Sequence, residues 1–273
     1  MSAGGGRGAR SGAPAALGLL AAGALALAAP LPAALAQAPP ARTAPADTGA
    51  PLTRAAVERL LAAAPADQAP DLRGANLAGA DLSGLDFRSA DLRGARLEGA
   101  RFVKAKLFGA NLSLARAGRA DFTGAVLDVA VLRGTDLTRA TLRDASLYAT
   151  ILIDADLTEA DLRGARVIGV FTNAKLVRAR LAGVRMGADP GNQPMGLMRT
   201  DLGGADLRGA DLTDADLRKT NLARADLTGA TVTGADVSGA NLAGAVLRQL
   251  RGADRLRGVD RALHADEAVR DTP

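Results

Sequence analysis

The stretch DLRGANLAGADLSGLDFRSADLRG, residues 71–94, repeats itself every five residues. An apolar centre recurs at every fifth position: Leu72, Leu77, Leu82, Phe87 and Leu92. Most of these centres have Ala two positions earlier and Asp or Asn one position earlier. A five-residue period matches neither the 3.6-residue period of an α-helix nor the two-residue period of a simple strand. A fixed repeat of this kind predicts a solenoid, in which each unit buries its apolar side chains by stacking on its neighbours.

The tandem motif A-[DN]-L-x-G resembles the pentapeptide repeat family. The resemblance implies an all-β fold, a right-handed quadrilateral β-helix in which each pentad forms one side of a square and four pentads complete a coil. It also implies that the central Leu or Phe and the small residue two before it point inward, while the other three residues face solvent. Elementary physics agrees, because one bulky and one small side chain per side fill a narrow shaft. Glycine at the corners supplies turn geometry, and hydrogen bonds between coils satisfy the backbone.

The repeat array extends over residues 71–249 and contains one fault. Its phase is unbroken from Leu72 to Val167, but the next centre, Phe171, comes four residues later instead of five. An irregular loop, residues 187–199, then carries no pentad signal, and the original phase returns at Leu202. We therefore expect about eight and a half coils and a rod roughly 40 Å long at the usual strand spacing.

Three departures inside the array have structural explanations. Ala117 is a small centre, and we expect large neighbours to fill its space, with Phe102 and Phe122 one coil apart and stacked. Thr135 and Thr150 replace the inward Ala of their pentads, and their hydroxyls are expected to bond to backbone.

Residues 1–36 have the layout of a secretory signal peptide. Arg7 and Arg10 precede an Ala/Leu-rich run, and a small-residue cleavage site ends at Ala36. Pro30 and Pro32 interrupt the apolar run before it reaches the roughly 20 residues that a membrane span needs. The sequence therefore predicts a periplasmic or secreted protein with no membrane span after cleavage. The absence of cysteine excludes disulfides and a lipid anchor through cysteine.

The segments that flank the array predict short helical caps at both ends. Residues 37–50 are rich in Pro, Ala and Thr and indicate a disordered linker. Residues 51–66 favour a capping helix, although a partner-binding helix is an alternative; its apolar face would carry Val57, Leu60, Leu61 and Ala64. Residues 250–273 favour an Arg-rich helical cap and tail, with Leu250, Leu256, Val259 and Leu263 as its apolar positions.

No catalytic, cofactor-binding or metal-binding residues are predicted. The many Asp residues occupy one slot before the apolar centre and have Arg or Lys nearby, which indicates a solvated ladder of ion pairs rather than a calcium site or a pair of catalytic carboxylates. His264, the single histidine, has no partners at the spacing of a metal site or a catalytic triad. We therefore expect no enzyme activity, no cofactor and no small-molecule substrate.

The outward slots turn apolar on two adjoining faces of the predicted helix. One face has the centres Phe87, Leu107, Leu127, Leu147 and Val167, and the next has the centres from Leu72 to Leu152. We call the candidate interaction residues the apolar patch: Phe108, Val129, Val131, Tyr148, Ile151, Ile153 and Ile168. Contiguous exposed apolar surface marks an interface. Two occupants remain open, namely the protein's own loop 187–199 and a protein partner or a second copy of this chain.

These observations favour an exported, non-enzymatic repeat scaffold that mediates protein–protein interaction through its outer face. The alternative is a topoisomerase-binding DNA mimic, as some members of the family are. A DNA mimic needs a strongly acidic rod, whereas the formal charge is +5 and becomes +3 once Arg7 and Arg10 are removed. Binding of single-stranded nucleic acid is disfavoured because Trp is absent and Tyr148 is the single tyrosine, so stacking rings are scarce.

Overall fold

The computed structural model describes residues 49–65, 67–188 and 199–271, all of which lie in the compact unit Arg42–Pro273. The predicted signal peptide and most of the predicted linker fall outside the described residues. The same is true of residues 189–198 of the irregular loop.

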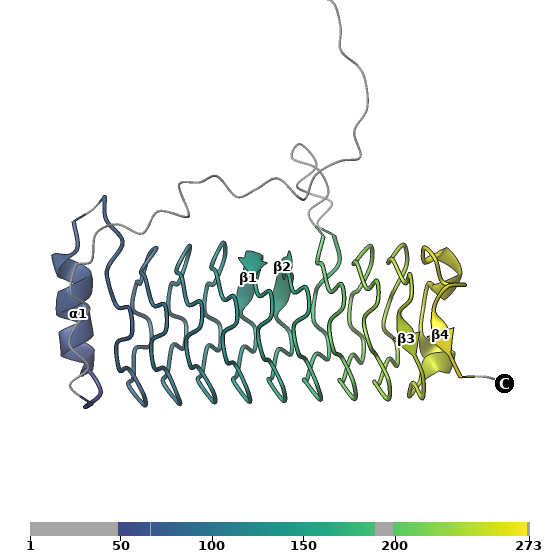
Figure 1. The fold of residues 1–273 in the computed structure, drawn as a ribbon, viewed down its shortest axis with the longest axis horizontal. Coiled ribbons are helices and arrows are strands. Elements are labelled where there is room, and N and C mark those ends of the chain that lie inside the picture. Colours follow the sequence, from purple (N-terminus) through teal and green to yellow (C-terminus); the bar gives the residue numbers. More distant parts are fainter. Residues whose placement is uncertain (1–48, 66, 189–198, 272–273) are drawn as a thin grey trace, which may run out of the picture. The chain divides into compact units, whose positions relative to one another are not determined.

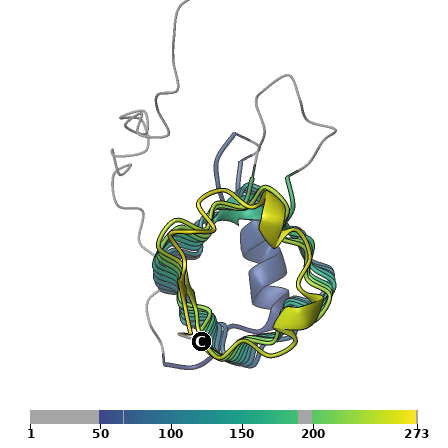
Figure 2. The same cartoon turned by 90° about the vertical axis from the view of Figure 1, so that its right-hand side faces the viewer.

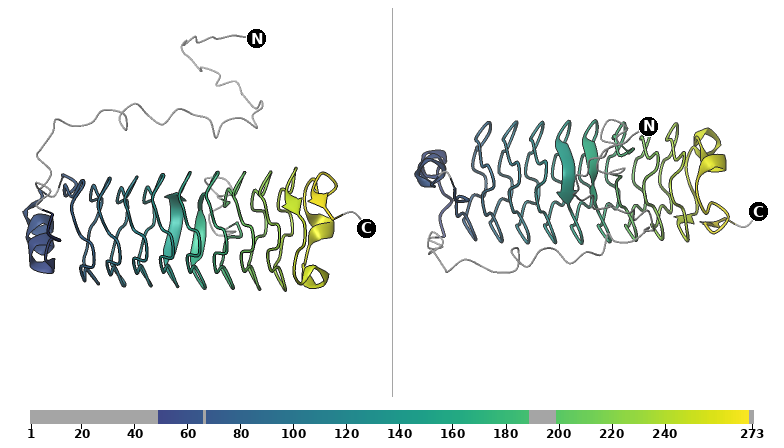
Figure 3. Two further views of the ribbon diagram at one scale, coloured as in Figure 1. Left: turned by 60° about the horizontal axis from the view of Figure 1, so that its bottom comes forward. Right: turned by 90° about the horizontal axis from the view of Figure 1, so that it is seen from above.

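The described chain winds into a stack of four-sided coils (Figure 1). Parallel β-bridges join residues twenty positions apart, as in the series Asp71, Asp91, Asn111, Val131 and Ile151. Seen along the axis, the coils lie over one another and form a single ring (Figure 2), and two further views show the same stacking (Figure 3). This arrangement is the expected quadrilateral β-helix.

The bridges divide the pentads among four faces, which we name A to D in chain order. Face A has the centres Leu72, Leu92, Leu112, Leu132, Leu152, Phe171, Leu202, Leu222 and Leu242. Face B has Leu77, Leu97, Ala117, Leu137, Leu157, Leu176, Leu207, Leu227 and Leu247. Face C has Leu82, Phe102, Phe122, Leu142, Leu162, Leu181, Leu212 and Val232. Face D has Phe87, Leu107, Leu127, Leu147, Val167, Met186, Leu217 and Val237.

Each pentad makes the same backbone hydrogen bonds. At the corner, the Ala75 N–H donates to the Leu72 carbonyl at 3.1 Å, which closes a tight turn. Between coils, the Leu72 N–H donates to the Asp91 carbonyl at 2.8 Å, and the Asp91 N–H donates to the Pro70 carbonyl at 2.8 Å. The repetition of this scheme satisfies the polar backbone of a structure in which few segments are long enough to count as strands.

The shaft is filled by the predicted inward residues. The apolar centres and their small partners are almost all fully buried, from Leu72 through Ala245. Phe102 and Phe122 stack at 5.0 Å with an interplanar angle of 9°, as predicted. Both threonine predictions are also confirmed, because Thr135 Oγ1 donates to the Leu112 carbonyl at 2.8 Å and Thr150 Oγ1 donates to the Leu147 carbonyl at 3.0 Å.

The four-residue step from Val167 to Phe171 shortens one corner between faces D and A. Here the chain forms β1 (Ser146–Ile151) and β2 (Arg166–Val170), which pair in parallel. The register matches Tyr148 with Ile168 and then shifts between Tyr148 and Thr150. The shift absorbs the missing residue, so that Val170 still pairs with Asp201 of the coil after the loop.

Helix α1 (Arg54–Ala63) packs on the first coil. The Thr53 hydroxyl accepts a hydrogen bond from the Ala56 N–H and begins the helix. Val57 and Leu61 are buried, whereas Leu60 is 36% exposed and does not belong to the inward face that the sequence predicted. The reason is helical geometry, since Leu60 and Leu61 point about 100° apart and the coil offers a narrow contact.

The C-terminal end forms short turns instead of the expected helix. β3 (Val246–Leu247) pairs with β4 (Val269–Arg270), and two 3-10 helices, η3 (Ala253–Arg255) and η4 (Val259–Arg261), lie between them. Gly252 and Gly258 precede these turns with φ values of 72° and 76°. Arg251, Arg257 and Leu263 bridge to the last regular coil, so the segment continues the ladder of the solenoid and cannot wind into one helix.

Within the described residues, no helix has both the length and the apolar character that crossing a bilayer requires.

Candidate interaction surface

The structure gathers the apolar patch at the corner between faces D and A and on face A itself. Phe108 and Val129 stand at the corner and are 54% and 46% exposed. Val131 and Ile151 are bridge partners on face A, and the Gly134 N–H donates to the Ile153 carbonyl at 3.0 Å in the same ladder. Val131, Tyr148, Ile151 and Ile153 are half-buried.

Ile168 corrects the prediction, because it is only 3% exposed. Its slot faces solvent in an ordinary five-residue side. In the shortened corner, however, Ile168 lies within β2 beside Tyr148 rather than in a protruding turn. Ile168 is therefore buried and does not form part of the exposed surface of the patch.

Tyr148 is the patch residue whose contacts fix its position. The Asp128 carboxylate accepts hydrogen bonds from Ser146 Oγ at 2.6 Å and from the Tyr148 N–H at 2.9 Å. The Arg166 guanidinium lies over the Tyr148 ring, 5.1 Å from its centroid, in a cation–π contact. The tyrosine is thus held in place by the coils before and after it.

Backbone strain marks the exposed part of this surface. Val129 has a φ of 62°, and it is the single β-branched residue with positive φ among the described residues. Left-handed backbone is costly for such a side chain, and such strain clusters at functional sites. Leu114, at the corner between faces A and B, has a φ of 60° and is 70% exposed. The sequence prediction missed Leu114, although a leucine in a slot that is usually glycine was a readable signal.

The rest of the outer surface carries the predicted ion pairs. In pentads of the form Asp-x-Arg, the carboxylate accepts from both the backbone and the side chain of the arginine. Arg73 Nη2 thus lies 2.7 Å from Asp71 Oδ2, and Arg218 Nη2 lies 2.8 Å from Asp216 Oδ2. These hydrogen bonds hold the pKa of Asp71 and of Asp216 below the ordinary value.

Among the described residues, no three His, Cys, Asp or Glu side chains lie where they could hold a metal ion together. His264 Nδ1 is 2.8 Å from Glu267 Oε1, and both side chains are exposed. This pair lies in the C-terminal turns, far in sequence from the apolar patch.

A family model described as pentapeptide repeats matches eight copies in this chain. The matched segments are residues 71–107, 105–144, 142–186, 197–234 and 226–254. Among curated proteins, none matches the chain.

Several solved structures are similar to this chain. HetL, a pentapeptide repeat protein involved in heterocyst differentiation regulation in the cyanobacterium Nostoc sp. strain PCC 7120, is 31% identical, and the match covers 79% of this chain and 93% of HetL with a TM-score of 0.36. Full-length QnrB1, a plasmid-mediated fluoroquinolone resistance protein, is 17% identical over 70% of this chain and 94% of its own, with a TM-score of 0.29. A pentapeptide repeat protein of the Arabidopsis thaliana thylakoid lumen is 30% identical over 42% of this chain and 66% of its own, with a TM-score of 0.23.

Proposed function

Because the chain belongs to the pentapeptide repeat family, we propose that it is an exported, non-enzymatic scaffold that binds a protein partner through the apolar patch. The proposal rests on Phe108 and Val129, whose side chains are about half exposed at a corner where the repeat elsewhere places polar residues or glycine. At about 25 cal/mol per Å², leaving such a surface in water forgoes a few kcal/mol of burial.

The strain at Val129 supports the same function. Glycine occupies the equivalent turn position in several neighbouring pentads, for example Gly109 and Gly124. A valine there costs free energy in the isolated protein and gains nothing from burial in the shaft. A contact with another molecule explains why an exposed isopropyl group stands at this position.

Affinity capture with matched variants tests the proposal. We expect Val129→Asp to fold, because Asp144, Asp154 and Asp214 already occupy this turn position with positive φ. A protein captured by the wild type from periplasmic extract or culture supernatant should be lost with Val129→Asp. It should be retained with Val103→Asp, a matched substitution of an outward valine on face C. Equal capture of the partner by both variants would contradict binding through the apolar patch.

Sedimentation separates a partner from the two other occupants of the patch. If a second copy covers it, the wild type sediments as an oligomer, and Tyr148→Asp combined with Ile153→Asp yields a folded monomer. If residues 189–198 cover it, replacing them with a short Gly linker lowers the melting temperature and makes the protein self-associate. A monomeric wild type whose loop deletion stays monomeric and equally stable excludes both of these occupants, and it leaves the patch without a role unless the capture experiment finds a partner.

Export is part of the proposal and has its own test. The layout of residues 1–36 supports removal after Ala36, which would leave Gln37 as the N-terminal residue. Intact-mass measurement of protein recovered from outside the cytoplasm checks this. A full-length species in the cytosol would contradict export while leaving the interaction surface untouched.

A DNA-mimic role remains the second candidate and is disfavoured by charge. The formal charge of the chain is +5, whereas a mimic of duplex DNA must present the dense negative charge of its backbone. A topoisomerase-binding assay tests it directly, and we expect no binding.

A further inference from the structure

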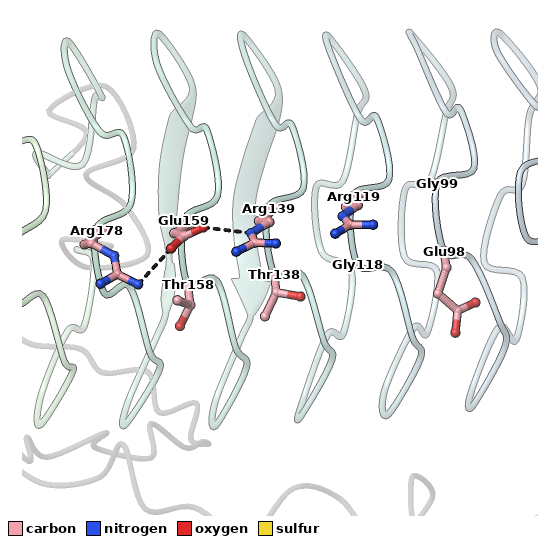
Figure 4. A pocket seen from close by; sticks show the side chains of 9 residues that line it. All are labelled: Glu98, Gly99, Gly118, Arg119, Thr138, Arg139, Thr158, Glu159 and Arg178. Atoms are coloured by element: carbon pink, nitrogen blue, oxygen red, sulfur yellow. Dashed lines mark hydrogen bonds and ion pairs between the residues drawn. The ribbon is translucent and has the colours of Figure 1, made fainter.

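A second surface feature lies at the corner between faces B and C, diagonally opposite the corner that carries the apolar patch. It is a hollow of about 590 Å³ whose lining includes Gly99 and Gly118. Arg119, Arg139, Glu98 and Thr138 stand around it (Figure 4).

The hollow exists because position 118 is glycine, although the backbone there could accommodate a side chain. Gly118 is not among the glycines with positive φ. A Cβ atom at this position would meet Thr138 Oγ1 at 3.4 Å and Asp136 Oδ2 at 3.7 Å, which are ordinary contact distances. The neighbouring coils carry Thr138 and Thr158 in the same slot. The glycine is therefore required neither by backbone conformation nor by space.

Charged side chains form an incomplete row along this corner. Glu159 lies between two arginines of adjacent coils, 2.7 Å from Arg139 Nε and 2.8 Å from Arg178 Nη2 (Figure 4). Arg119 is next in the row and makes no ion pair within the described part of the chain. On its far side the row continues with Gly99, so no carboxylate stands beside Arg119 as Glu159 stands beside Arg139.

Cationic groups also gather on face B at this level. Arg96 and Arg116 are bridge partners in adjacent coils, and neither forms an ion pair with any other described residue. Like charges directly opposite each other on adjoining strands are unfavourable. The Nε atom of Arg96 is buried and has no hydrogen-bond acceptor among the described residues. These two arginines do not line the hollow, but they add positive charge on face B beside it.

Glu98 restricts which class of ligand the hollow can bind. Its carboxylate lines the hollow, and its Oε2 atom is buried without a hydrogen-bond donor among the described residues. A simple anion would meet the arginines that line the hollow but would also lie beside the negative Glu98 carboxylate. A peptide brings a carboxylate together with backbone N–H donors, and it can therefore satisfy both sides of the hollow.

We propose that the hollow binds an acidic segment of a protein. A Glu or Asp carboxylate of this segment takes beside Arg119 the place that Glu159 takes beside Arg139, and its backbone N–H groups face Glu98. This inference goes beyond the proposed function, because it concerns the opposite corner of the coil and does not depend on the apolar patch or on export.

The test uses the full chain and a fluorescein-labelled octaglutamate peptide, with octalysine as the control peptide. We expect fluorescence anisotropy to show octaglutamate binding at about 20 mM salt, weakening strongly at about 300 mM, and no octalysine binding. Arg119→Gly and Gly118→Thr should each weaken binding by about tenfold or more. Both substitutions introduce residues that neighbouring coils carry in the same slots, as Gly99 and Thr138 do. Gly99→Glu should block the site from within, since Glu159 holds the same conformation with a φ of 60°.

The matched control is Arg224→Gly, another arginine with positive φ on a different corner, and it should bind octaglutamate like the wild type. Equal binding by all variants, equal binding of octalysine, or no binding at about 20 mM salt would each overturn the proposal. Displacement of octaglutamate by inorganic phosphate at equal concentration would overturn the peptide assignment, because it would show a plain anion site.

Discussion

At Val129 the backbone angle φ lowers the stability of the fold, while the side chain lies on the proposed interaction surface. Its φ of 62° places a β-branched side chain in left-handed backbone, whereas glycine takes this conformation without steric cost. Among the residues that the structure describes, seventeen other than glycine have positive φ, but most are Arg, Asp, Lys or Asn, whose unbranched Cβ suffers less. The free energy lost at Val129 is therefore specific to this position on the patch.

We predict that Val129→Gly raises the free energy of unfolding by about 0.5–1 kcal/mol while it weakens partner capture. Chemical denaturation measures the first effect and affinity capture the second. Arg224→Gly is the control, with a smaller gain in stability and unchanged capture. A lower stability for Val129→Gly would show that its isopropyl group makes contacts that outweigh the strain.

Substitutions at Leu142 and Asp154 test which residues of the pentads point into the shaft and which point to solvent. Leu142 is fully buried in the shaft, so Leu142→Asp should cost several kcal/mol and abolish cooperative unfolding. Asp154→Ser should change stability by at most about 0.5 kcal/mol, because Asp154 is exposed and accepts one long hydrogen bond from Asn173. Equal melting temperatures for the two variants would mean that the assignment of inward and outward residues is wrong.

Asp161 shows that an outward position is not always a neutral one. Its side chain is only 13% exposed, and it accepts hydrogen bonds from the backbone and guanidinium of Arg163 while Arg180 lies 3.5 Å away. We predict that Asp161→Ser costs about 1–2 kcal/mol, more than Asp154→Ser, in the same denaturation experiment. Sequence position alone assigns both residues to the solvent side and cannot distinguish them.

At the level of elements, the five-residue period predicted the coil and its faces because each side buries its residues by the same rule. The Phe102–Phe122 stack and the threonine hydrogen bonds followed from that rule. Departures from the period were harder to predict. The burial of Ile168 depends on how a four-residue corner becomes a strand, and the C-terminal turns depend on pairing with the last regular coil although their sequence lacks the pentad motif. Such tertiary contacts leave no periodic signal.

The apolar patch and the hollow also differ in how far the sequence predicts them. Phe108 and Val129 were predicted to be exposed because they are large apolar residues in outward slots that elsewhere hold polar residues or glycine, which is visible once the faces are assigned. The hollow at Gly118 was not predicted, since a glycine in a glycine-rich repeat attracts no notice. Its meaning depends on φ and on the free space around it, and neither can be read from the sequence.

Helix α1 offers a matched pair of adjacent substitutions. We predict that Val57→Asp detaches the helix from the first coil, lowers the melting temperature and promotes association, because the exposed coil then offers unpaired backbone groups. Leu60→Asp should leave both properties unchanged, since Leu60 is already 36% exposed. Sedimentation and thermal melting of the two variants check this. Monomeric, equally stable Val57→Asp protein would show that the helix does not protect the end of the solenoid.

At the level of the whole molecule, the ion-pair ladder determines how the rod responds to acid. Hydrogen bonds from Arg73, Arg208 and Arg218 lower the pKa of Asp71, Asp206 and Asp216 below the ordinary value of 3.8. A carboxylate whose pKa is lower in the folded state contributes stability above its unfolded pKa and loses that contribution as the pH falls through its folded pKa. With His264 as the single histidine, few groups titrate between about pH 5 and pH 8.

We therefore predict a melting temperature that is nearly constant from about pH 8 to pH 5 and falls steadily below about pH 4. The triple variant Asp71→Asn, Asp206→Asn, Asp216→Asn should melt lower at neutral pH and lose less on acidification, because it lacks three of the carboxylates that must be protonated. Each Asp–Arg pair contributes little stability by itself. The change in the slope of melting temperature against pH is therefore more informative than the loss of stability from any single pair. Parallel acid curves for the wild type and the triple variant would mean that the Asp–Arg pairs contribute nothing. The acid response would then originate from other carboxylates, such as Asp161 and Asp236, whose pKa values are also lowered.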